Sequence, residues 1–193
     1  ERIFTLRNVP DTDKIKNFID KNSPKRAIIV GAGFIGLEMA ENLYNKGIFV
    51  TIVEMADQVM NVIDYEMASA VHNHLKIKNV EFYLKDGVSS FKERSDKRIT
   101  VNLSSGKELL TDMVVLSIGV KPENTLAKEA GLKVGIAGGI SVNDFMQTSN
   151  PDIYALGDAI EFNNPIINKS FVIPLAGPAN KQGRIAAGNI AGE

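Results

Sequence analysis

Apolar residues in the first 120 positions of the chain occur in short continuous runs, separated by polar segments or by segments of helical periodicity. Such runs are typical of strands that are buried on both faces of a parallel sheet. Runs that alternate with helical segments predict an α/β fold. The four runs are residues 27–30, 48–53, 80–84 and 113–118.

Helices are predicted on either side of the first run, where apolar residues recur three and four positions apart. Residues 8–11 are expected to form a turn, and Thr12 or Asp13 is expected to cap a helix that ends at residues 22–24. The helix after the first run is expected to stop at Lys46-Gly47, since glycine commonly ends helices.

A third helix is expected to begin after Asp64, which can cap it. Its buried stripe is predicted to comprise Met67, Val71 and Leu75, and its last turn to carry Lys76 and Lys78. The two histidines of this helix, at positions 72 and 74, point to different sides. They are therefore expected to be structural or surface residues, and no metal site is predicted.

The crossover between the third and fourth runs is not helical. Residues 88–92, 99–103 and 107–110 are short strand-like pieces joined by turns, and they predict a β-meander. The pattern changes beyond residue 121. The expected elements there are a short helix over 124–130, an extended piece over 140–142, a strand over 153–156, a loop over 159–173 and a last helix over 175–190.

Three glycines spaced G-x-G-x-x-G follow the first run, at Gly31, Gly33 and Gly36. Gly31 permits a tight turn, Gly33 lets the backbone approach a pyrophosphate, and Gly36 allows a helix and a strand to pack closely. The free N–H groups and the positive end of the helix dipole then favour phosphate. Strand, glycines and helix together predict a three-layer, Rossmann-like NAD(P)-binding domain with a meander crossover.

Glu54 ends the second run, eighteen residues past Gly36 (54 − 36 = 18). A carboxylate at this position can accept hydrogen bonds from both hydroxyls of an adenosine ribose, and it repels the 2′-phosphate of NADP(H). A βαβ unit with an incidental acidic residue at the strand end would give the same spacing. The complete context favours a site for NAD.

Composition narrows the function classes further. The chain of 193 residues is 44% hydrophobic and has a net charge of −1, which is typical of an ordinary globular protein. It has no basic excess that would indicate a nucleic-acid partner, and no apolar run approaches the ~20 residues that span a bilayer. Cysteine is absent, which excludes disulfides, thiolate metal sites and thiol catalysis within this chain.

Five segments resemble, in order and spacing, motifs of the pyridine nucleotide-disulfide oxidoreductase family. The resemblance is closest to its branch of coenzyme A-disulfide reductases, NADH oxidases and NADH peroxidases. Residues 4–11 resemble the entry to the family's NADH domain, and residues 31–38 its nicotinamide-dinucleotide fingerprint. Residues 117–123 resemble a glycine-proline motif at the exit of that domain, 148–158 the second flavin motif, and 174–184 the flavin-facing helix.

The resemblance implies roles for residues around the nicotinamide. Glu38 would hold the carboxamide, Ile35 would lie against the ring, and Phe34 occupies the gating aromatic position. Gly119, which closes the fourth run, is expected on the ligand side of the sheet. Without the resemblance, Glu38 would be an ordinary helix residue.

The resemblance also implies flavin contacts in the last third of the chain. Gly157 and Asp158 would lie at a strand end, with Asp158 bonded to the ribityl chain of FAD, and the backbone at Leu175-Ala176 would approach the flavin ring. Without the resemblance, Asp158 would be a turn former. Residues 1–120 are therefore expected to form an NADH-binding domain and residues 121–193 part of an FAD-binding domain.

The family's first flavin glycine motif and its redox cysteine have no counterpart here, so the chain is interpreted as an internal fragment that is inactive alone, with no catalytic residue of its own. In the expected parent, a cytoplasmic homodimer, NADH would pass hydride through FAD to a disulfide, mixed disulfide or oxygen species. Two alternatives stay open: a fragment of a cysteine-free flavoenzyme similar to ferredoxin reductases, and a stand-alone NAD-sensing module.

Overall fold

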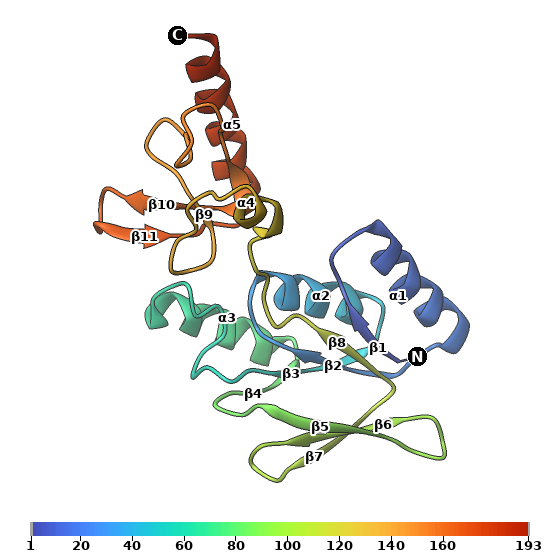
Figure 1. Cartoon of the computed structure of the whole chain (residues 1–193). Helices are drawn as coiled ribbons and strands as arrows, with labels where there is room; N and C mark the ends of the chain where they lie inside the picture. Colours follow the sequence, from blue (N-terminus) through green and yellow to red (C-terminus); the bar gives the residue numbers. More distant parts are fainter. Residues whose placement is uncertain (1, 193) are drawn as a thin grey trace. The chain divides into compact units, whose positions relative to one another are not determined.

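A five-stranded parallel sheet forms the centre of the first of two units, Glu1–Gly119 and Val120–Glu193, into which the chain divides. The computed structural model describes residues 2–192. In the order β1-β8-β2-β3-β4 (Figure 1), the strands are β1 (Ile3–Thr5), β8 (Met113–Leu116), β2 (Arg26–Val30), β3 (Phe49–Val53) and β4 (Glu81–Tyr83).

The direction in which the chain adds strands to the sheet reverses at β2. β3 and β4 are added in turn on one side of β2, and β8 is later added on the other side of β2. All neighbouring pairs are parallel, and Val30 stands in register with both Val53 and Leu116. The carboxyl ends of β2, β3 and β8 therefore meet at one edge, which is where doubly wound sheets bind ligands.

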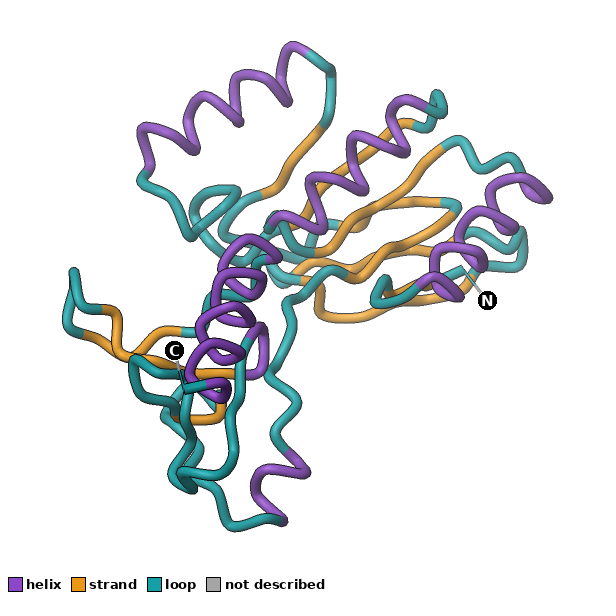
Figure 2. The backbone as a smooth tube through the Cα atoms, turned by 90° about the horizontal axis from the view of Figure 1, so that it is seen from above, coloured by secondary structure: helices purple, strands orange, loops and turns teal. Residues whose placement is uncertain are grey.

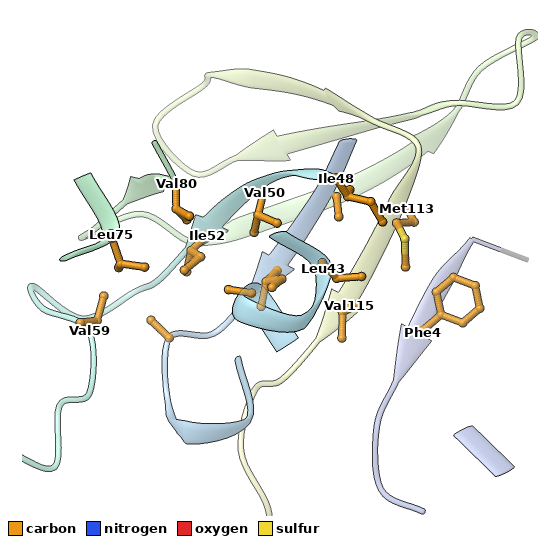
Figure 3. Close-up of a cluster of buried hydrophobic side chains, with 14 of the residues drawn as sticks. Phe4, Leu43, Ile48, Val50, Ile52, Val59, Leu75, Val80, Met113 and Val115 are labelled. Atoms are coloured by element: carbon orange, nitrogen blue, oxygen red, sulfur yellow. The ribbon is translucent and has the colours of Figure 1, made fainter. Parts of the chain in front are cut away.

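Helices cover one face of this sheet. They are α1 (Val9–Asn22), α2 (Phe34–Asn45) and α3 (Tyr65–Ile77), and Figures 1 and 2 show α2 lying between the other two. Because successive residues of a strand face opposite sides, Ile29 and Val115 pack on the helix side. Figure 3 shows Leu43 of α2 beside Val115 in this core.

An antiparallel meander covers the opposite face of the sheet. It consists of β5 (Val88–Glu93), β6 (Ile99–Leu103) and β7 (Glu108–Thr111). Ile28 and Val114 of the sheet pack against apolar residues of β6. The expected three-layer α/β fold with a meander crossover is thus confirmed.

The second unit has a smaller core. Its sheet has the order β11-β10-β9, in which β10 is parallel to β9 and antiparallel to β11. Met146, Ile160 and Ala186 form the buried cluster. The elements are α4 (Thr125–Glu129), β9 (Ile140–Ser141), the 3₁₀ turn η1 (Gly157–Ala159), β10 (Ile160–Asn164), β11 (Lys169–Phe171) and α5 (Ala176–Ala191).

The turn predicted over residues 8–11 is wrong, because α1 already begins at Val9. Asn8 is the capping residue in place of Thr12 or Asp13, and its side-chain oxygen accepts a hydrogen bond of 2.9 Å from the N–H of Asp11. Pro10 stands in the first turn, where a helix leaves the N–H without a partner in any case. The proline is therefore compatible with the first turn of this helix, which begins one residue earlier.

The predicted buried stripe of α3 is also partly wrong. Met67 is 64% exposed, whereas Ala68, His72 and Leu75 are buried. The loop after β3 packs on this face, since the N–H of Val59 donates to Nε2 of His72 at 3.1 Å. A polar residue thus takes a core position that the apolar pattern did not indicate. Lys78 is the C-cap residue and not part of the last turn.

The strand predicted over residues 153–156 is not formed there; only an isolated bridge joins Tyr154 to Gln147. Asp158 consequently lies in a 3₁₀ turn and not at a strand end. The stretch predicted as a loop contains the hairpin β10–β11 instead. The apolar pattern did not predict β10 because this strand contains a buried acidic residue, Glu161. The partners of its carboxylate lie 24 and 25 residues earlier in the chain.

Candidate functional site

A cavity of about 500 Å³ lies at the edge of the first unit where β2, β3 and β8 end. Of the predicted site residues, Gly31, Gly33, Glu54 and Gly119 contribute to its wall, so the structure brings these separate parts of the sequence together. The lining residues are Val30, Gly31, Gly33, Val53, Glu54, Met55, Asn61, Asp86, Gly87, Val88, Ser117, Ile118 and Gly119.

The tight turn after β2 depends on two of the glycines. Gly31 has a φ of +103°, and its N–H donates to the carbonyl of Val53 at 2.8 Å. A Cβ at Gly31 would collide with the carbonyl of Ser117, and one at Gly36 with the carbonyl of Gly31. The Ser117 hydroxyl is 3.1 Å from the Val30 carbonyl and 3.0 Å from that of Gly31, which ties β8 to the turn.

Gly33 differs from the other two glycines of the motif because it faces open space. A Cβ there would meet no atom within 4 Å. Gly33 is also the N-cap residue of α2, and it gives this helix no side-chain cap. The first N–H groups of α2 thus lack the partner that a capping side chain normally supplies, and they suit a phosphate.

Glu54 lies at the end of β3, and both of its carboxylate oxygens already have backbone partners. Oε2 accepts a hydrogen bond of 2.7 Å from the N–H of Ala32, inside the glycine motif. Oε1 accepts one of 2.8 Å from the N–H of Ala56. Each oxygen keeps a further lone pair, so Glu54 can hold the glycine turn in place and still accept a hydroxyl hydrogen bond.

The three residues expected around the nicotinamide do not line this cavity. Phe34, Ile35 and Glu38 are exposed on the first turns of α2. Phe34 and Glu38 line a groove between α2 and α3, and Ile35 and Glu38 line one between α1 and α2. Gly119, with a φ of +99°, does contribute to the cavity.

The expected flavin residues lie close together in the fold of the second unit. The turn η1 packs against α5. The N–H of Gly157, a residue with a φ of +74°, donates to Oε1 of the buried Gln182 at 2.8 Å. Asp158 is exposed next to it, while Leu175 is the N-cap residue of α5 and Ala176 its first residue.

Three residues that line the cavity were not predicted to do so from the sequence: Ser117, Asp86 and Gly87. Asp86 and Gly87 follow β4, and the N–H of Asp86 donates to the carbonyl of Glu54 at 3.1 Å. Their position after a parallel strand was the available signal, because the loops that follow such strands meet at the same edge.

Neither histidine belongs to the cavity wall. His72 is buried, and its ring stacks on Phe82 with centroids 5.3 Å apart. Burial, with a smaller contribution from the positive charge of Lys76, lowers the pKa of His72. Within residues 2–192, no group of three or more acidic or histidine side chains could hold a metal ion.

None of the helices within the described residues has the length and hydropathy needed to cross a membrane. The apolar runs of the sequence are accounted for by the two buried faces of the sheet.

Comparison with known proteins identifies the family. The family model described as pyridine nucleotide-disulphide oxidoreductase matches residues 1–183. The chain belongs to this family. Its resemblance to the family's motifs is thereby confirmed over nearly the whole sequence, as is the α/β fold with a Rossmann-type domain that its structural neighbours share.

Individual relatives share this match. A coenzyme A disulfide reductase of Staphylococcus haemolyticus is 33% identical over 98% of this chain, and an NADH oxidase of Methanocaldococcus jannaschii is 37% identical over 98%. The chain spans 42% of the length of each. The protein in the crystal structure of reduced CoADR-RHD from Bacillus anthracis is 53% identical in sequence to this chain, with a TM-score of 0.93. The match covers 100% of this chain and 34% of the Bacillus anthracis chain.

Proposed function

We propose that residues 1–120 bind NADH and that residues 121–193 contribute part of an FAD site. The parent activity would be transfer of hydride from NADH through FAD to a disulfide, a mixed disulfide or an oxygen species. The observation that carries the proposal is the cavity where β2, β3 and β8 end, lined by Gly31, Gly33 and Glu54.

The residues of this cavity fit a dinucleotide. Gly33 leaves space beside the uncapped start of α2, where backbone N–H groups would bind the pyrophosphate. The free lone pairs of Glu54 would accept hydrogen bonds from the adenosine ribose. When bound, NADH supplies the hydride, and the chain's own task is to bind and orient it.

The nicotinamide end is a separate part of the proposal. Phe34, Ile35 and Glu38 are exposed at the start of α2, which leaves them accessible to a ligand bound along this helix. In the parent enzyme, Glu38 would orient the carboxamide, Ile35 would contact the ring and Phe34 would act as the gate.

The hydrogen bond from the Gly157 N–H to the Gln182 side chain supports the FAD contacts proposed for the second unit. This bond holds the turn that presents Asp158 as an exposed carboxylate, and the turn packs on α5, whose uncapped N-terminus begins at Leu175-Ala176. These groups fit a flavin ligand that offers hydroxyls. The remainder of the parent would complete the site, within a cytoplasmic homodimer.

The similarity to the Bacillus anthracis CoADR-RHD favours the disulfide-reductase branch over an enzyme similar to ferredoxin reductases. The family match, which extends to residue 183, also argues against a module that only senses NAD.

Calorimetric titration of the chain with NADH tests the proposal. Gly33→Ala places a methyl group where the pyrophosphate would lie, at a cost of about 1–3 kcal/mol for overpacking, or about five- to 150-fold in affinity. Gly183→Ala is the matched control, since it adds the same methyl group in open space on α5. Saturable binding weakened by Gly33→Ala alone supports the proposal. Absence of binding, or equal weakening by both substitutions, contradicts it.

A further inference from the structure

Asp86 is a second carboxylate in the wall of the dinucleotide cavity, and no family motif assigns it a role. It follows β4, and its backbone N–H bonds to the carbonyl of Glu54 at 3.1 Å. Glu54 and Asp86 therefore stand at the ends of two adjacent parallel strands, at the same edge of the sheet.

The Asp86 side chain is fixed by the meander. Its Oδ2 accepts a hydrogen bond of 2.6 Å from the Ser105 hydroxyl, and its Oδ1 accepts one of 3.0 Å from the Ser105 N–H. Ser105 belongs to the turn between β6 and β7, and the neighbouring Ser104 N–H also bonds to the Gly87 carbonyl at 2.8 Å. The crossover thus holds Asp86 on one wall of the cavity.

The charge at this wall is negative. Among the described residues that line the cavity, Glu54 and Asp86 are ionisable acids and none is a lysine or arginine. The hydrogen bond from the Ser105 hydroxyl lowers the pKa of Asp86, so this carboxylate keeps its charge at neutral pH. A site for a 2′-phosphate normally offers an arginine instead.

We propose that Asp86, fixed by Ser105, is a specificity-determining residue that excludes NADP(H) from this cavity. Its charge repels the 2′-phosphate, which NADP(H) carries and NAD(H) lacks, so it discriminates by a repulsive element added to the attraction of Glu54 for ribose hydroxyls. The inference rests on the proposed binding of NADH.

Asp86→Asn tests the charge without disturbing the anchor. The new amide oxygen can accept from the Ser105 N–H, and its NH₂ group can donate to the Ser105 hydroxyl, so both bonds to the meander can persist. The control is Asp96→Asn, which removes the same charge from the meander at a residue that pairs with Arg98 and lies outside the cavity wall.

The experiment is a fluorescence titration of wild type and both variants with NADH, in which NADPH is the competitor, at low and at high salt. Asp86→Asn is expected to tighten NADPH binding on the order of five- to tenfold at low salt and less at high salt, because exposed charges are screened. NADH affinity is expected to change less than about twofold, since NADH places no phosphate at this position.

Unchanged NADPH affinity in Asp86→Asn, with NADH binding intact, overturns this inference alone. Equal tightening by Asp96→Asn also overturns it, because the effect would then follow net charge and not position. Absence of NADH binding in wild type overturns the proposed function as well.

Discussion

The carboxylate of Glu54 accepts a hydrogen bond of 2.7 Å from the backbone N–H of Ala32, in the middle of the glycine motif. The acid expected to recognise the ribose therefore also holds the turn expected to bind the pyrophosphate. Glu54 thus serves the loop geometry and, in the proposed function, the recognition of the nucleotide, so its substitution should have two effects that can be measured separately.

Glu54→Ala should weaken NADH binding about ten- to a hundredfold, the equivalent of the roughly 1.5–3 kcal/mol of a charge-assisted hydrogen bond. It should also lower the free energy of unfolding by about 1–3 kcal/mol, since the N–H groups of Ala32 and Ala56 lose their partner. Calorimetry and urea denaturation measure the two effects. Unchanged NADH affinity in Glu54→Ala would contradict the ribose-reading role.

Gly36→Ala should destabilise the first unit by about 1–3 kcal/mol or more, because its Cβ would collide with the Gly31 carbonyl, which is backbone and cannot rotate away. Gly33→Ala, with open space around it, should leave the unfolding free energy nearly unchanged. Urea denaturation compares them. Equal stability of the two variants would show that Gly36 is not needed for helix–strand packing.

Stability should fall as the pH drops below about 6.5, the ordinary pKa of histidine. His72 has a lowered pKa in the folded state, so the unfolded chain binds more protons in this range, and the stabilisation present above 6.5 is lost as the pH falls through the folded pKa. Protonation also places a donor at Nε2 opposite the Val59 N–H.

The variant His72→Gln should lose this pH dependence, and His74→Gln, at the exposed second histidine, should retain it. Unfolding free energies at pH 5 to 8 provide the measurement. Because the chain has only two histidines, a loss that persists in both variants would have to come from carboxylates.

Glu161→Ala should destabilise the second unit by about 1–3 kcal/mol. The buried carboxylate accepts hydrogen bonds from the N–H groups of Ile136 (3.1 Å) and Ala137 (2.8 Å), and the change leaves both without this partner. Hydrogen exchange should speed up at these two amides. Protection equal to that of wild type would mean that the loop is held by other contacts.

The chain alone should not catalyse NADH-dependent reduction of coenzyme A disulfide, because it contains no cysteine to carry a thiol or disulfide. A coupled assay that follows NADH absorbance, with purified chain and added FAD, measures this. Turnover above that of free FAD would contradict the assignment of this chemistry to other parts of the parent enzyme.

The sequence predicted the elements that are held by local patterns and by burial on both faces. The strands around Ile29 and Val115 and the meander were expected correctly, because continuous apolar runs and short alternating ones are strong signals. The glycine turn could also be predicted, for a different reason: Gly31 and Gly36 take backbone positions where a side chain would collide with other backbone atoms.

Errors arose where distant partners decide the structure. Glu161 lies in β10, a strand formed by pairing with β9 and β11, and its buried carboxylate is satisfied by a loop that lies 24 and 25 residues earlier. Nε2 of the buried His72 likewise has its partner in the loop at Val59, thirteen residues away. Asp86 was not predicted to line the cavity, because its side chain is held there by the Ser105 turn, nineteen residues away.

An NMR titration of the ¹⁵N-labelled chain with NADH tests the central claim most directly, since every glycine N–H of the cavity reports its own surroundings. If NADH binds in this cavity, Gly31, Gly33, Gly87 and Gly119 should show saturable shifts, and Gly106, which lies in the meander outside the cavity wall, should show none. Unchanged resonances at Gly31 and Gly33 at saturating NADH, or shifts confined to the second unit, would contradict a dinucleotide site in this cavity.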